Sequence, residues 1–89
     1  RAAMAVGQAQ AVAMVAAAHH QLPVFSYAPR EVKKSVTDYG GSSKEQVQQM
    51  VMILLEMDQL PESYDAADAL AVAICHINAS REAELVTRE

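Results

Sequence analysis

Two aspartates three positions apart have the spacing in this 89-residue chain that is best suited to chemistry. Asp65 and Asp68 would share one face of a helix, and the small residues Ala66 and Ala67 between them leave room for a ligand. Two ionised carboxylates this close repel each other unless a cation offsets their charge. Mg²⁺ is commonly held by one or two carboxylates together with substrate phosphate. On spacing alone, however, helix capping by an aspartate is the stronger explanation.

A group of basic residues suggests a second kind of site, one that contacts a phosphate backbone. Arg30, Lys33 and Lys34 fall on one helical face, and Lys44 follows after a Gly-Gly turn. Residues 30–44 hold four bases and two acids, a local charge of +2. Because the net charge of the chain is −4, the other residues together carry −6. A negative chain is poorly suited to nonspecific nucleic-acid binding. From the residues alone, a solvated helix face is therefore favoured over a DNA-binding one.

The histidines and the cysteine do not indicate a metal site. His19 and His20 are neighbours, so on a helix their side chains point apart, and His76 is expected in the core or near a helix end. A single cysteine, Cys75, excludes an intrachain disulfide and a cysteine zinc cluster. It fits a reducing, cytoplasmic setting.

The elements that must position these residues are mostly helices. Aromatic residues make up 4% of the chain and alanine is abundant, which disfavours an all-β fold. The patterns predict helices over residues 2–20, 29–36, 44–57 and 65–77, with a capping box between Ser42 and Glu45. Residues 24–27 are the one predicted strand, and it would need partner strands from elsewhere. The longest unbroken apolar run, residues 11–18, is too short to cross a membrane.

These patterns predict one small domain over residues 1–77 and a polar, flexible tail over residues 78–89. The chain begins with Arg1 rather than Met, which suggests an excerpt of a longer protein.

Several sequence blocks, in order, resemble RuvC-type Holliday junction resolvases. The blocks are GQA at residues 7–9, LPVF at 22–25, YAPREVKK at 27–34, KEQVQQMV at 44–51 and DAADALAVAICH at 65–76. Several blocks in order are far more specific than one short motif. The resemblance covers residues 7–76 and corresponds to the C-terminal portion of the family.

The resemblance implies an α/β, ribonuclease-H-like fold with a central mixed sheet flanked by helices. It implies a cytoplasmic homodimer that nicks two strands of four-way junction DNA in recombination and repair, alongside a branch-migration motor. The family uses four mostly acidic residues around Mg²⁺, with Mn²⁺ as an alternative, and Asp65 and Asp68 match the last two. Lys33 and Lys44 match lysines implicated in junction binding. With the resemblance, metal ligation by Asp65 and Asp68 is favoured over helix capping.

One departure from the family pattern limits these expectations. The family's first two acidic residues lie upstream of the matched blocks, and no residue here corresponds to them, so we expect this chain alone not to cleave DNA. Two alternatives stay open: another ribonuclease-H-like nuclease, and a non-catalytic helical module for interaction or dimerisation. Upstream sequence would distinguish the first, and dimerisation without magnesium binding would favour the second.

Overall fold

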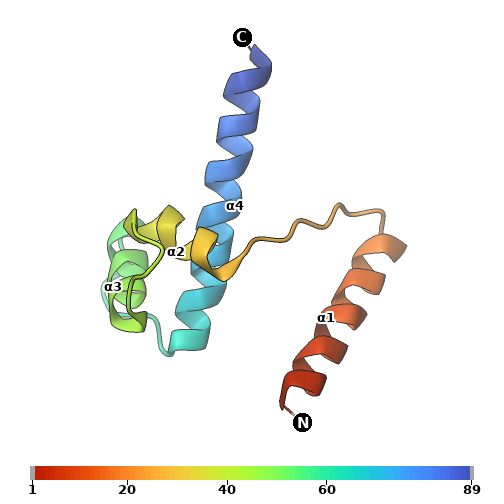
Figure 1. Cartoon of the computed structure of the whole chain (residues 1–89), viewed down its shortest axis with the longest axis horizontal. Coiled ribbons are helices and arrows are strands. Elements are labelled where there is room, and N and C mark those ends of the chain that lie inside the picture. Colours follow the sequence, from red (N-terminus) through yellow and green to blue (C-terminus); the bar gives the residue numbers. More distant parts are fainter. Residues whose placement is uncertain (1, 89) are drawn as a thin grey trace.

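The computed structural model describes the backbone of residues 2–88 and the side chains of residues 7–86, which leaves Arg1 and Glu89 outside it. Four helices account for most of this part of the chain (Figure 1). They are α1 (Ala2–His19), α2 (Pro29–Thr37), α3 (Lys44–Leu54) and α4 (Tyr64–Arg88). None of the helices in the described part is long and apolar enough to pass through a membrane.

Helices α2, α3 and α4 pack together around a small apolar core. Each contributes residues spaced about one turn apart, so that one face of each helix points inward. The buried residues are Val32 and Val36 of α2, Val47 and Val51 of α3, and Ala71, Ile74 and Cys75 of α4. Val51 is fully buried, with 0% of its surface exposed. The small side chains on α4 allow the other two helices to approach it closely, which makes α4 the element that organises this bundle.

Helix α1 stands away from the bundle and does not pack on any other helix in the described structure (Figure 1). Its side chains from residue 7 onward are exposed, except that Ala17 is half-buried. Alanine gives the segment high helix propensity without much apolar surface to bury. The helix ends in a Schellman motif, in which Gln21 has φ 58° and the Leu22 N–H donates to the Ala17 carbonyl at 2.8 Å. The predicted helix over residues 2–20 is thus confirmed to within one residue.

The predicted strand over residues 24–27 does not form. This segment belongs to an irregular linker between α1 and α2 that makes no β-ladder within residues 2–88 (Figure 1). Its apolar and aromatic residues have strand propensity, but a strand needs a partner to accept and donate its backbone hydrogen bonds. The linker is instead fixed at Tyr27, whose hydroxyl is hydrogen-bonded to His76 of α4.

The predicted capping box at the start of α3 is wrong by one residue. Ser43 is the N-cap: its hydroxyl accepts from the Gln46 N–H, and the Gln46 side chain accepts from the Ser43 N–H. Ser42 is buried and donates its hydroxyl to the Tyr39 carbonyl instead. The helix also ends earlier than expected, at Leu54, because Glu56 turns the chain with φ 53°.

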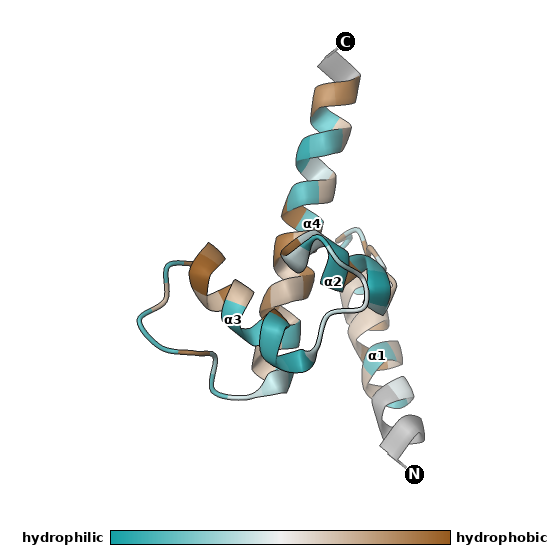
Figure 2. Cartoon of the chain, turned by 60° about the vertical axis from the view of Figure 1, so that its left-hand side comes forward, coloured by the Kyte–Doolittle hydropathy of each residue, from teal (hydrophilic) through white to brown (hydrophobic). Residues whose placement is uncertain are grey.

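Helix α4 is longer than the sequence predicts and continues through Arg88 rather than ending near Ile77. The polar composition of this second half suggests loop, but Arg81, Glu82, Ala83 and Leu85 are all good helix formers. Figure 2 shows these turns as mostly hydrophilic compared with the turns that face the bundle. Residues 78–88 are therefore helical, while their flexibility and the proposed boundary at residue 77 stay predictions.

Candidate metal and nucleic-acid site

The two aspartates singled out by their spacing lie on the first turns of α4, and both are exposed. Ala67 between them is buried with 1% of its surface exposed, so it faces the bundle while the carboxylates face outward. Ser63 caps this helix, because its hydroxyl accepts from the Ala66 N–H at 3.0 Å. The capping role that competed with metal ligation is thus filled by Ser63. Asp65 and Asp68 are left available for a ligand.

The two carboxylates stand without further ligand groups beside them in the described part of the chain. Among the residues with described side chains, no three or more His, Cys, Asp or Glu groups come together as a ligand cluster. Two carboxylates on one helical turn do fit Mg²⁺, which usually keeps several waters and binds substrate phosphate as well. Asp65 and Asp68 are therefore candidate ligands only.

Lys44 lies beside this end of α4 through contacts with Tyr64. The Lys44 Nζ is 5.8 Å from the centre of the Tyr64 ring, within the range of a cation–π interaction. The Tyr64 hydroxyl donates to Glu45 Oε1 at 3.0 Å. Because Tyr64 directly precedes Asp65, these contacts bring the starts of α3 and α4 together. A cationic side chain thus approaches the helix end that carries the two aspartates.

The same contacts shift two pKa values. The pKa of Glu45 is lowered, first by its own backbone N–H and then by the Tyr64 hydroxyl, both of which donate to the carboxylate. The pKa of Tyr64 is raised, because the phenol that donates to Glu45 would lose this bond and gain a like-charged neighbour on ionisation. Tyr64 lies just before the helix predicted over residues 65–77. Its partners lie on another helix, so no local pattern could have revealed its role.

The basic residues of α2 do not all face the same surroundings. Arg30 extends along the Gly-Gly turn, where its Cγ and Nε would lie 2.6 and 3.1 Å from a Cβ added at Gly40. Lys33 is half-buried, and Lys34 is exposed beside a groove between α2 and the second half of α4. The structure therefore brings Arg30 to the turn that leads to Lys44 and directs Lys34 towards a different surface.

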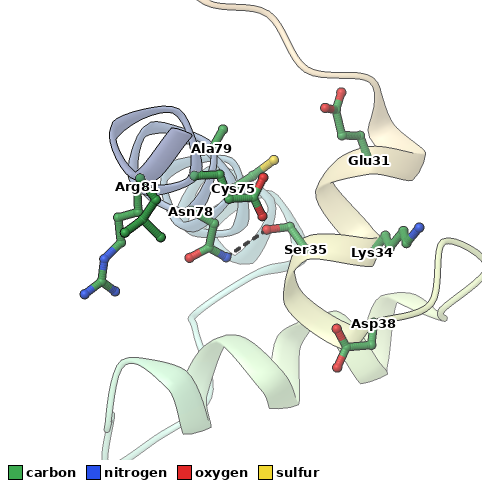
Figure 3. A pocket seen from close by; sticks show the side chains of 10 residues that line it. Glu31, Lys34, Ser35, Asp38, Cys75, Asn78, Ala79 and Arg81 are labelled. Atoms are coloured by element: carbon green, nitrogen blue, oxygen red, sulfur yellow. Dashed lines mark hydrogen bonds between the residues drawn. The ribbon is translucent and has the colours of Figure 1, made fainter. Parts of the chain in front are cut away.

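The groove beside Lys34 has a volume of about 700 Å³ (Figure 3). The side chains of Ser35 and Asn78 meet across it, with the Asn78 amide donating to the Ser35 hydroxyl at 3.0 Å. Glu31, Asp38 and Glu82 also line it, so its charges are mixed. Neither Asp65 nor Asp68 lines this groove, which separates it from the candidate metal site.

His76 has a packing role, as the sequence suggests. Its Nδ1 lies 2.7 Å from the Tyr27 hydroxyl, and the ring of Phe25 packs at 4.7 Å between centroids. Burial raises the pKa of Tyr27, with smaller contributions from Cys75 and Glu31. His76 therefore fixes the linker to α4.

Comparison with known proteins identifies the family. The family model described as crossover junction endodeoxyribonuclease RuvC matches residues 1–76. This chain belongs to the RuvC family.

Individual relatives agree with this assignment. The chain is 56% identical over 79 residues to the RuvC protein of Natranaerobius thermophilus, covering 89% of this chain and 49% of the relative. It is 55% identical over 76 residues to a Dehalococcoides mccartyi RuvC, covering 85% of this chain and 46% of the relative. The Thermus thermophilus RuvC structure superposes with a TM-score of 0.79 at 36% identity, over 88% of this chain and 47% of that one. The chain thus spans about half the length of the relatives it matches.

Proposed function

We propose that this chain is part of a Holliday junction resolvase, a metal-dependent endodeoxyribonuclease that hydrolyses phosphodiester bonds in four-way DNA junctions. The observation that carries the proposal is the start of α4. In a chain of the RuvC family, Asp65 and Asp68 stand exposed on a helix that Ser63 already caps, next to Lys44. These acidic side chains do not cap the helix, and a basic side chain lies beside them. Such a pair of charges suits the binding of a cation and a phosphate together.

In this proposal Asp65 and Asp68 hold Mg²⁺, with Mn²⁺ as the alternative, together with ligands from outside the described side chains. The bound metal would stabilise the charge that develops on the attacked phosphate and activate a water molecule. The rigid turn of α4 keeps the two carboxylates at a fixed separation. A carboxylate that does not ligate the metal can accept the proton of the attacking water. Because no further ligand group joins these two aspartates among the described side chains, we expect that this chain alone does not cleave DNA.

Junction DNA is the proposed substrate, and Arg30, Lys33, Lys34 and Lys44 are its proposed contacts. The cation–π contact with Tyr64 restricts Lys44 to the region near Asp65, where a phosphate bridging lysine and metal would be held on two sides. The Arg30 side chain lies against Gly40 in the turn between α2 and α3, where it can contact a neighbouring phosphate.

The remaining expectations concern the assembly. We propose a ribonuclease-H-like fold in which residues 24–27 gain partner strands of a mixed sheet. A homodimer, cooperation with a branch-migration motor and a cytoplasmic location follow from family membership alone. The exposure of Val24 and Phe25 in the linker supports a partner at this segment, because both leave much of their apolar surface in water.

A gel mobility assay with a labelled four-way junction and a linear duplex of the same sequence tests the DNA-binding part. We expect tighter binding to the junction, with affinity that falls as salt is raised. Replacing Lys33 and Lys44 together by glutamine should weaken binding and flatten the salt dependence. The control variant is Arg88→Gln, at the last residue of α4, which should bind like the unaltered chain. Equal, salt-independent affinity for both DNAs would contradict the proposal.

A non-catalytic interaction module is the second candidate, and the exposed helix α1 favours it. Val12 and Val15 are each 70% exposed on a helix that no described element covers. Sedimentation analysis showing a dimer that binds neither Mg²⁺ nor junction DNA would support this alternative over the nuclease.

A further inference from the structure

The turn between α2 and α3 presents an aromatic ring that the proposed metal site does not use. Tyr39 is 63% exposed and lies between the bases of α2 and Lys44. An aromatic side chain left in water on a polar turn contributes little to the core. Core packing therefore does not explain an aromatic residue at this position.

The backbone of Tyr39 is held by two hydroxyl side chains. Its N–H donates to the Thr37 hydroxyl at 3.2 Å, and its carbonyl accepts from the Ser42 hydroxyl at 2.6 Å. The Thr37 hydroxyl in turn lies 2.8 Å from the Lys33 carbonyl, to which it donates. Ser42 is buried, and its hydrogen bond to the Tyr39 carbonyl is partly buried. The turn is thus pre-organised, and ligand binding would not need to order it.

The ring itself rests on Gly41. A Cβ added at Gly41 would lie 2.8 Å from the Tyr39 Oη and 2.9 Å from its Cζ. At Gly40 the added atom would meet the Arg30 side chain. The absence of side chains at both glycines therefore lets the Tyr39 ring and the Arg30 side chain lie close against the same turn. The Tyr39 ring and the Arg30 side chain thus lie against neighbouring residues of one turn.

We infer that Tyr39 and Arg30 form a contact site for an unpaired nucleotide, in which the tyrosine ring stacks on the base and the arginine contacts the adjoining phosphate. This inference rests on the proposed DNA-binding function and adds to it a contact with unpaired DNA. Aromatic stacking is tolerant of sequence because every base has a π-face. Paired bases inside a duplex are not accessible in this way, so the site discriminates between unpaired and paired DNA.

The test measures binding of the chain to oligo-dT and to a blunt duplex of equal length at fixed salt. Tyr39→Leu should weaken binding to oligo-dT by about 5-fold or more, the lower end of what loss of one base stack causes. Binding to the duplex should change by less than about twofold, since phosphate contacts remain. Tyr39→Trp should retain the oligo-dT affinity. Phe25→Leu is the matched control, because Phe25 is similarly exposed at 60% but lies away from the turn.

The outcomes separate the inference from the function on which it rests. An unaltered chain that binds the four-way junction but not oligo-dT overturns this site alone, whereas one that binds neither oligo-dT, duplex nor junction overturns the proposed function as well. If the unaltered chain binds DNA and Tyr39→Leu binds oligo-dT equally well, Tyr39 is only a turn residue and the inference fails. Equal weakening for oligo-dT and duplex would also overturn it, since the ring would then merely support the turn. Circular dichroism of each variant verifies that the helices are retained.

Discussion

Helix α1 and the α2–α4 bundle are both rich in apolar residues, but among the described side chains the bundle buries them and α1 does not. In the bundle, valines one turn apart form a stripe that faces the neighbouring helices. In α1, small residues surround the helix, and no single face is apolar enough to direct packing. The comparison teaches that apolar content does not create a core unless its spacing concentrates it on one face. The bundle can position a site by itself, whereas α1 needs a partner.

The largest expected effect distinguishes the two regions by stability. Val51→Ala removes two fully buried methyl groups and should lower the free energy of unfolding by about 2 kcal/mol. Val15→Ala in α1 removes the same groups from a side chain that is 70% exposed. This substitution should change the free energy of unfolding by less than about 0.5 kcal/mol. Urea denaturation followed by circular dichroism measures both. Similar losses would mean that α1 is buried against a partner in solution.

A second prediction concerns the start of α4. Ser63→Ala removes the N-cap and should cost about 1 kcal/mol. Asp68→Asn changes an exposed side chain beyond the first turn and should alter stability by less than about 0.5 kcal/mol. Thermal melts of both variants give the comparison. A larger loss for Asp68→Asn would assign the aspartate a structural role and weaken its assignment as a ligand.

The linker provides a third test, because it joins the two regions. Tyr27→Phe removes the hydrogen bond to His76 and should destabilise the chain by about 0.5–1.5 kcal/mol. Amide exchange in residues 24–28 should accelerate with it. Tyr39→Phe, on the exposed turn, is the matched hydroxyl deletion and should leave both quantities nearly unchanged. Unchanged exchange in Tyr27→Phe would show that His76 does not hold the linker.

The smallest expected effect is a pH dependence within the bundle. Glu45, whose pKa is lowered from 4.5, adds stability that is present above this value and lost as pH falls through the folded pKa. Tyr64, whose pKa is raised from 10.0, adds stability that is present below this value and lost as pH rises through the folded pKa. In Glu45→Gln the Tyr64 pKa should move back towards 10.0, as measured by NMR titration of the ring. An unchanged Tyr64 pKa would disprove the contact.

Local sequence patterns predict much of the bundle but not its contacts between helices. The spacing of Val47 and Val51 is sufficient to predict α3, because both reach the same core. The capping box was placed one residue early, since the pattern cannot tell that the Ser42 hydroxyl is engaged by the turn. The segment at 24–27 has strand propensity, yet a strand forms only beside a partner strand, and local propensity does not tell whether one is present. The end of α4 was missed because polar composition outweighed helix propensity in the prediction.

The candidate site shows the same division. Asp65, Asp68 and Lys44 could be selected from motif and family resemblance, and the structure places Lys44 near the start of α4. Tyr64 could not be selected, because its hydrogen bond and cation–π contact join residues distant in sequence. Likewise, only the folded turn brings Arg30 against Gly40.

Titration with Mn²⁺ followed by NMR tests most directly whether Asp65 and Asp68 bind a divalent cation. Paramagnetic broadening should be centred on the first turns of α4, should be competed by Mg²⁺ and should disappear in the Asp65→Asn, Asp68→Asn double variant. This double variant should keep the fold of the bundle. Broadening that is absent, or that centres instead on Glu31, Asp38 and Glu82 along the groove, would contradict binding by the two aspartates.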